Sequence, residues 1–194
     1  MNELYAPPQA EIAVADTDQP DFYVVATWKF YLMSLMTFDL YLVYWFYRNW
    51  RNVRLRTGES LWAPARGLFY IFFTHSLFSR VDSKLKEEDY EFSWSPGSLA
   101  TLLVLMTIIS NVLDRLSFKM IGSPATDFLS ILMVPILPAI ALKAQRAINV
   151  ACGDTDGSQN TKLTAANWIW IVLGGLWWAL VMLGLYAILL TPGY

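Results

Sequence analysis

The chain contains 194 residues, of which 56% are hydrophobic and 15% are charged, and its formal net charge is −2. Soluble domains average about 45–50% apolar and about 25% charged residues, so this composition favours a membrane protein. The small net charge and the lack of a recognised nucleic-acid module argue against a nucleic-acid partner. The single cysteine, Cys152, excludes an intrachain disulfide and is interpreted as a structural thiol.

Residues 1–21 differ in character from the rest of the chain. They contain three prolines, five acidic residues, no Lys or Arg, and few large aliphatic side chains. Such a segment cannot bury enough apolar surface to fold, so we predict a flexible acidic N-terminal tail. The start is not basic, which argues against a cleaved secretory signal. Residues 22–194 are then predicted to form a single helical membrane domain.

Four long apolar runs dominate that domain. A run of about 18 or more apolar residues can cross the roughly 30 Å hydrocarbon core as a helix, which satisfies its own backbone groups. The first run is expected to continue as one helix to Thr57, where Gly58 is a helix stop. The last run has no charged residue after Lys162 and is the strongest. We predict spans at about 28–47, 98–118, 124–142 and 165–190.

A fifth apolar stretch, residues 62–80, is shorter than these runs. Its charge-free part, residues 67–79, suits an interfacial or re-entrant helix better than a span. The predicted fold class is therefore an all-α integral membrane protein with about four transmembrane helices plus a short interfacial or re-entrant helix at 62–80. Pro135 and Pro138 lie inside the third run and predict a helix kink there.

The distribution of the 14 Lys and Arg residues predicts a topology. If residues 62–80 stay at the interface, the segments 48–97 and 143–164 share one side. That side then holds most of the basic residues, whereas a crossing at 62–80 divides them evenly. Cytoplasmic loops carry the excess of Lys and Arg, so we predict loops 48–97 and 143–164 in the cytoplasm and both termini outside. The five-span form stays open as an alternative.

A basic cluster follows the aromatic end of the first run. It consists of Arg48, Arg51, Arg54 and Arg56, with Trp50 among them. Aromatic residues favour the headgroup boundary, and basic residues beside it are attracted to anionic lipid. The cluster either fixes the depth of the helix or binds an anionic membrane lipid or a protein partner.

Polar residues inside the apolar runs are candidates for function. Asp39 lies near the middle of the first run, where an ionisable group usually faces protein or water. It is interpreted as a helix–helix contact, a proton or ion pathway group, or an interfacial residue. Asn111, Asp114 and Arg115 lie near the end of the second run and can pair with another span. The only histidine, His75, has no neighbouring metal ligands in the sequence, and we expect no metal, cofactor or catalytic residue.

The last run also carries a helix-packing pattern. Gly174, Gly175 and Ala179 include a small-xxx-small spacing, which lets two helices approach closely. This pattern predicts packing within the chain or against a second chain.

Several motifs of the chain resemble a family of bacterial inner-membrane proteins of unknown function. The motifs are Lys29-Phe30, residues 37–41 (TFDLY), residues 44–50 (YWFYRNW), residues 56–59 (RTGE) and residues 145–149 (QRAIN). The resemblance implies a multi-pass location in the bacterial inner membrane and no particular activity. The family usually has glycine where this chain has Asp39, which argues against a family-wide role for that carboxylate.

Three functions agree with these features. The first is a non-enzymatic subunit, adaptor or accessory factor of a membrane complex, with membrane lipids and another membrane protein or itself as partners. The second is a small oligomeric transporter or channel that uses Asp39 and the proline-containing third run. The third is an immunity protein against a membrane-active toxin. Small loops and the absence of a catalytic motif favour the first.

Overall fold

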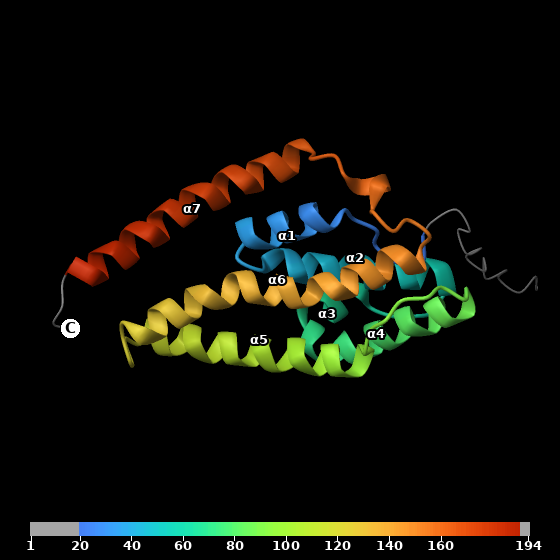
Figure 1. Ribbon diagram of the computed structural model, residues 1–194, viewed down its shortest axis with the longest axis horizontal. Coiled ribbons are helices and arrows are strands. Elements are labelled where there is room, and N and C mark those ends of the chain that lie inside the picture. Colours follow the sequence, from blue (N-terminus) through green and yellow to red (C-terminus); the bar gives the residue numbers. More distant parts are fainter. Residues whose placement is uncertain (1–19, 191–194) are drawn as a thin grey trace, which may run out of the picture.

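The computed structural model describes residues 20–190, and all regular secondary structure in that range is helical (Figure 1). The helices follow in the order α1 (Thr27–Met36), α2 (Leu40–Thr57), α3 (Ala63–Leu68), α4 (Tyr70–Glu87), α5 (Pro96–Phe118), α6 (Ala125–Ala151), the 3-10 helix η1 (Ser158–Asn160) and α7 (Ala165–Leu190). The predicted tail at residues 1–21 lies, up to residue 19, outside the described residues.

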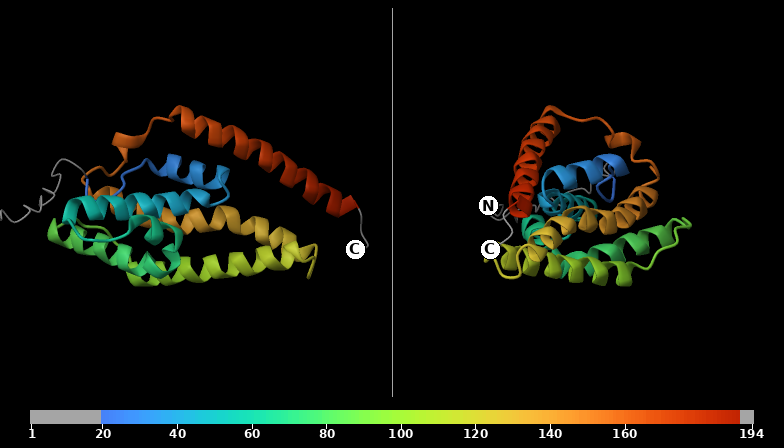
Figure 2. Two further views of the ribbon diagram at one scale, coloured as in Figure 1. Left: turned by 180° about the vertical axis from the view of Figure 1, so that it is seen from behind. Right: turned by 60° about the vertical axis from the view of Figure 1, so that its left-hand side comes forward.

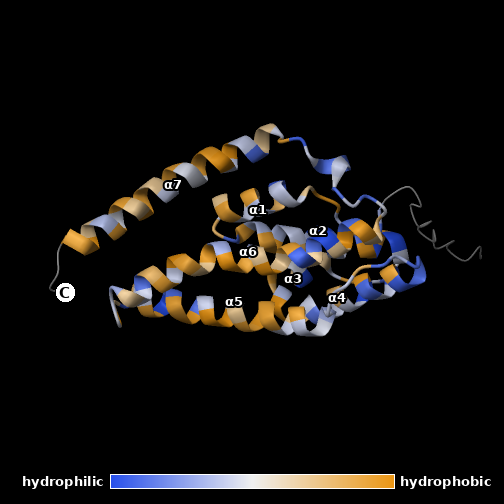
Figure 3. Cartoon of the chain, in the orientation of Figure 1, coloured by the Kyte–Doolittle hydropathy of each residue, from blue (hydrophilic) through white to orange (hydrophobic). Residues whose placement is uncertain are grey.

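Three of these helices, α5, α6 and α7, are long and apolar enough to cross a membrane. They correspond to the last three predicted spans, so the all-α membrane-compatible fold is confirmed in that form. Helix α6 continues to Ala151, beyond the predicted end at 142, so the first part of the predicted loop 143–164 is helical. Figure 3 shows apolar residues along these helices and hydrophilic residues gathered where α2 and α4 end. Helix α6 continues through Pro135 and Pro138, and the Tyr31 hydroxyl donates to the Pro135 carbonyl at 3.3 Å.

The first apolar run is not one helix. It is divided into α1 and α2 by a reversal at Thr37, Phe38 and Asp39, and the last two have left-handed φ values of 50° and 64°. The Thr37 hydroxyl donates to the Met33 carbonyl at 2.8 Å and accepts the Tyr41 N–H at 3.0 Å, so it satisfies both helix ends. The prediction of a continuous helix to Thr57 is therefore wrong, because the Thr37 hydroxyl takes the place of the Thr37 carbonyl as the acceptor for the Tyr41 N–H. A left-handed φ favours glycine, and Asp39 adopts this conformation here.

The tip of the α1–α2 hairpin packs near the middle of α7. The Trp178 indole donates to the Leu35 carbonyl at 3.0 Å, and Phe38 stacks on Trp178 with ring centroids 4.8 Å apart. Gly174 is buried against Met36, and a Cβ there would overlap the Met36 carbonyl. Gly174 thus makes a helix contact, as one of the predicted packing residues.

Residues 62–80 also form a reversal rather than one short helix. Helices α3 and α4 meet at Phe69, and α3 packs on α2, where Gly67 leaves no room for a Cβ beside Tyr47. The Tyr70 and Thr107 hydroxyls are 3.4 Å apart, and Thr107 lies at the middle of α5. A pair of helical hairpins, α1–α2 and α3–α4, therefore ends beside the middles of the long helices (Figure 2).

Helix α2 lies at the centre of the core. Trp45, Phe46 and Trp50 are fully buried, and the Trp45 indole donates to the Gln145 side chain of α6. Phe46 stacks on Tyr70 with ring centroids 4.7 Å apart, which joins α2 to α4. Burial of an aromatic side chain contributes about 1.5–3 kcal/mol to the free energy of folding. This face of α2 therefore stabilises the contacts with both α4 and α6.

An extended segment, residues 20–26, passes between α2 and α6, and Val25 within it is fully buried. Side-chain amides supply the hydrogen bonds that a helix or sheet would give this backbone. Asn49 accepts the Tyr23 N–H at 3.0 Å, and Asn149 donates to the Val25 carbonyl at 3.0 Å and accepts the Val25 N–H at 3.4 Å. Gln145 donates to the Tyr23 carbonyl at 3.3 Å. We call Asn49, Gln145 and Asn149 the amide hub.

Replacement of Asn149 by Leu tests the amide hub. Asn149→Leu keeps the branching and the number of side-chain heavy atoms and leaves the backbone groups of Val25 unpaired, and each buried unpaired group costs about 1–3 kcal/mol. We expect the free energy of unfolding in detergent, measured by denaturant titration, to fall by roughly 2–4 kcal/mol. Asn111→Leu is the control, because Asn111 is exposed and its amide donates to the Thr107 carbonyl of its own helix. Equal losses in both variants contradict the role of the hub.

Adjacent glycines of α7 provide a second matched test. In Gly174→Ala the new methyl overlaps the Met36 carbonyl, and overpacking costs about 1–3 kcal/mol. In Gly175→Ala the methyl meets nothing within 4 Å, so the better helix propensity of Ala should stabilise by about 0.5–1 kcal/mol. Thermal unfolding of the two proteins should shift in opposite directions. A shift of the same sign in both rules out close packing at Gly174.

Candidate functional site

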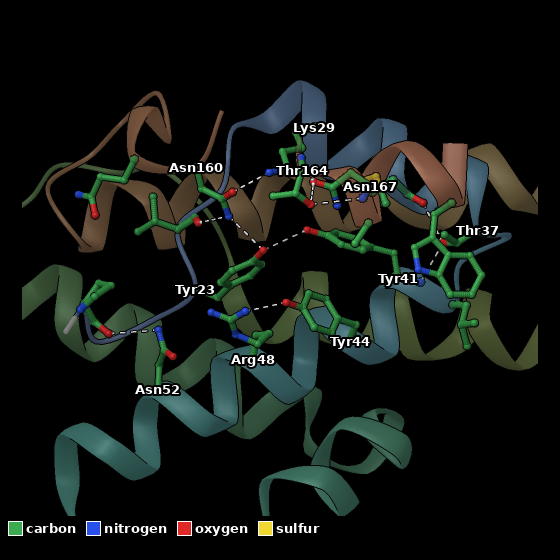
Figure 4. Close-up of a pocket in the computed structure, with 17 residues that line it drawn as sticks. Tyr23, Lys29, Thr37, Tyr41, Tyr44, Arg48, Asn52, Asn160, Thr164 and Asn167 are labelled. Carbon is green, nitrogen blue, oxygen red and sulfur yellow. Dashed lines mark hydrogen bonds between the residues drawn. The ribbon is translucent and has the colours of Figure 1, made fainter. Parts of the chain in front are cut away.

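A pocket of about 690 Å³ lies between the extended segment, α1, α2, the loop after α6 and the first turns of α7 (Figure 4). One face of α2 forms its floor, because Tyr41, Tyr44, Arg48 and Asn52 recur every three or four residues. Met33, Leu40 and Trp170 give apolar lining. The remaining labelled lining residues in Figure 4 are Tyr23, Lys29, Thr37, Asn160, Thr164 and Asn167.

The pocket contains two cationic side chains and no acidic one. Lys29 is 3% exposed and donates to the Asn160 side-chain oxygen at 2.7 Å and to the Lys162 carbonyl at 2.6 Å. Both acceptors are neutral, so they hydrogen-bond the ammonium group without neutralising it. Arg48 donates to the Tyr44 hydroxyl at 2.6 Å, and its guanidinium lies 4.6 Å from the centre of the Tyr23 ring.

Arg48 keeps unused hydrogen-bonding capacity. Its Nε is buried and has no hydrogen-bond partner within residues 20–190. Two further hydroxyls belong to residues that line the same pocket: the Tyr23 hydroxyl accepts from the Asn160 amide at 3.0 Å, and the Tyr23 and Tyr41 oxygens are 3.5 Å apart. The arrangement presents a positive charge and several hydrogen-bonding groups to the same space, which suits an anion.

The predicted basic cluster is divided among different environments. Only Arg48 lines the pocket, whereas Arg51 and Arg54 are exposed elsewhere on α2. Arg56 pairs with Asp21 at 2.9 Å and holds the start of the extended segment. Trp50 is fully buried, and the Arg66 guanidinium lies 4.3 Å from its ring centre. Trp50 therefore cannot contact a lipid at the surface, and it belongs to the core.

The predicted intramembrane polar residues form no hydrogen bond or ion pair with one another in the described part of the chain. Asp39 lies at the tip of the α1–α2 hairpin, and its Oδ1 is buried without a hydrogen-bond partner there. Asp114 accepts a hydrogen bond from Ser130 of α6. Asn111 donates to the Thr107 carbonyl of its own helix at 2.8 Å, and Arg115 is exposed.

The other candidate reactive groups are held by structural contacts. His75 Nε2 is 3.0 Å from the Thr101 hydroxyl of α5. Burial raises the pKa of the Cys152 thiol to about 11, and its Sγ faces the Phe22 carbonyl at 4.0 Å. A hydrogen bond from Arg80 lowers the pKa of Glu59. Within residues 20–190 no three His, Cys, Asp or Glu residues lie close enough to hold a metal ion.

Sequence reasoning missed most of the pocket. No motif of the sequence marks Tyr23 or Lys29 as a site residue, and Asn160 lies in a polar loop without a motif. The spacing of Tyr41, Tyr44 and Arg48 along one helical face was the signal present in the sequence. Its partners come from segments more than 100 residues apart, such as Lys29 and Asn160.

Comparison of the chain with protein-family models, curated proteins and solved structures gives no match.

Proposed function

We propose that this chain is a non-enzymatic multi-pass protein of the bacterial inner membrane that acts as an accessory subunit or adaptor of a membrane complex. The supporting observation is the exposure of α7. This helix packs mainly against α1. Of the 18 consecutive residues that form its most apolar part, only 6% are buried. An adaptor needs such a surface for a second membrane protein.

One face of α7 suits close approach of another helix. Gly175 and Ala179 are both exposed, and a Cβ on Gly175 would meet open space. Lipid tails are as apolar as leucine, so helices associate in a membrane through close packing rather than through the hydrophobic effect. Small residues on an exposed helix favour that packing, and large side chains such as Leu176 and Leu180 can then surround the contact.

The distribution of basic residues supports a topology with three crossings. Arg115 and Lys119 lie at the α5–α6 end, whereas the basic residues of α4 and most of those of α2 lie at the opposite end, where α2, α4 and α6 stop (Figure 1). The positive-inside rule makes that opposite end cytoplasmic, as predicted for loops 48–97 and 143–164. Asp21 is also there, through its bonds to Arg56 and Lys84. In this topology the chain enters α1 from the cytoplasm and α7 ends outside, so the two termini of the helical domain lie on opposite sides, unlike in the four-span prediction.

The two hairpins are re-entrant in this arrangement. Their tips lie beside Trp178 and Thr107, which are near the middles of α7 and α5. Non-helical backbone at membrane depth is tolerated where protein covers it, and α7 and α5 cover these two reversals.

Cysteine labelling tests the topology. A cysteine introduced by Lys119→Cys should react with a membrane-impermeant maleimide in intact cells, whereas one introduced by Asp89→Cys should react only after permeabilisation. The raised pKa of Cys152 leaves little thiolate at neutral pH, so the unaltered protein is the control and should remain unlabelled. Labelling of the Asp89→Cys protein in intact cells contradicts this topology.

Photo-crosslinking tests the adaptor function. A photoreactive amino acid at Ala179 should give one stoichiometric protein adduct in cells, and the same residue at Leu105 of α5 should give lipid adducts only. Leu105 is a suitable control because it is also exposed and apolar. Lipid adducts alone at both positions contradict an adaptor role for α7.

A transporter or channel is the second candidate, and the unpartnered Asp39 Oδ1 at the tip of a broken helix favours it. Helix breaks and acidic groups at membrane depth recur in ion pathways. If the purified protein without partners conducts ions in liposomes and Asp39→Asn abolishes that flux, the transporter replaces the adaptor.

A further inference from the structure

We propose that the pocket between α1, α2 and α7 binds an anionic phospholipid of the cytoplasmic leaflet, with its phosphate at Arg48 and Lys29 and its acyl chains toward Leu40. The proposal goes beyond the adaptor function and rests on the topology given for it. It follows from the charge of the pocket, its polarity gradient and its depth.

The positive charge of the pocket favours an anionic ligand. Lys29 and Arg48 form no ion pair within residues 20–190, and no carboxylate lines the space around them. A buried cation without a counter-charge is unfavourable, so an anion that enters gains from both groups. The free Arg48 Nε and the Tyr44 and Tyr23 hydroxyls can supply hydrogen bonds to phosphate oxygens.

The polarity of the pocket changes along α2 as it does along a lipid. Arg48 and Asn52 lie toward the cytoplasmic end, and Thr37 and Leu40 lie at the tip of the hairpin. From Leu40 to Asn52 the helix rises about 18 Å, at about 1.5 Å per residue. One leaflet of the hydrocarbon core is about 15 Å thick, so the floor of the pocket spans the distance from headgroup to midplane.

The apolar part of the pocket opens toward the membrane. Leu40 of α2 is 56% exposed and Trp170 of α7 is 46% exposed, and both line the pocket. Tyr44, which also lines the pocket, is 40% exposed and has both an apolar ring and a hydroxyl. A free phosphate would occupy the cationic end and leave these apolar surfaces uncovered. A phospholipid covers both regions, which is why we assign it to this class of ligand.

The test uses the full chain in lipid nanodiscs, with Arg48→Gln compared with Arg51→Gln. Both variants remove one guanidinium from α2, but Arg51 is exposed outside the pocket. Retention of phosphatidylglycerol against phosphatidylcholine is measured by native mass spectrometry after delipidation. We expect the unaltered protein and Arg51→Gln to prefer phosphatidylglycerol, and Arg48→Gln to bind it about tenfold more weakly, because a charge-assisted phosphate contact is lost.

A second pair of variants keeps the test decisive if Arg48→Gln misfolds. Ala166 lines the pocket from the first turn of α7, whereas its neighbour Ala165 does not, and both are exposed. Ala166→Trp should fill the pocket and reduce phosphatidylglycerol retention, and Ala165→Trp should leave it unchanged. Thermal unfolding verifies that each variant is folded.

Three results would overturn the proposal. The first is equal retention of both lipids by the unaltered protein. The second is an equal effect of the two variants within either pair. The third is displacement of phosphatidylglycerol by millimolar inorganic phosphate, which would make the pocket a site for a soluble anion.

Discussion

The amide hub is the interaction on which the arrangement of the other elements depends. Residues 22–25 are buried outside any helix or sheet, so regular secondary structure does not satisfy their backbone groups. Asn49 of α2 and Gln145 and Asn149 of α6 bond this backbone from two sides, so one set of side chains joins three elements. Because the segment leads directly into α1, the hub also sets the direction of the α1–α2 hairpin and places Tyr23 beside Arg48.

The hairpins explain how short helices can belong to a membrane fold. Helix α1 has 10 residues and cannot cross a bilayer. The Thr37 hydroxyl satisfies groups at both sides of its reversal, and the ring of Phe38 is covered by Trp178. Helix α2 combines a buried aromatic face with a polar face along the pocket. Its four arginines and its other polar residues lower its mean hydropathy, so α2 is not among the helices apolar enough to cross a membrane.

The sequence predicts the long apolar helices well because length and hydropathy are local properties. Spans near 98–118 and 165–190 correspond closely to α5 and α7. The reversal at Phe38 and Asp39 could not be predicted, since neither residue is a usual helix breaker and tertiary contacts outweigh their helix propensity. The roles of Asn49, Gln145 and Asn149 could not be predicted either, because all three bond an extended segment whose position depends on the fold. For the two residues of α6, that segment lies more than 90 residues away in the sequence. For the site, the spacing of Arg48 and the tyrosines was available, but the location of Lys29 and Asn160 beside them required the fold.

The lipid pocket and the exposed α7 are physically linked through one helix. The first turn of α7 forms a wall of the pocket, and Gly174 and Trp178 hold its middle against α1. A ligand that contacts both α2 and this first turn binds best when α7 is in the position described here, so it stabilises that position by its differential affinity. A protein that docks on the Gly175 and Ala179 face acts on the same helix. By thermodynamic reciprocity, a partner that keeps α7 in place strengthens lipid binding, and one that displaces α7 weakens it.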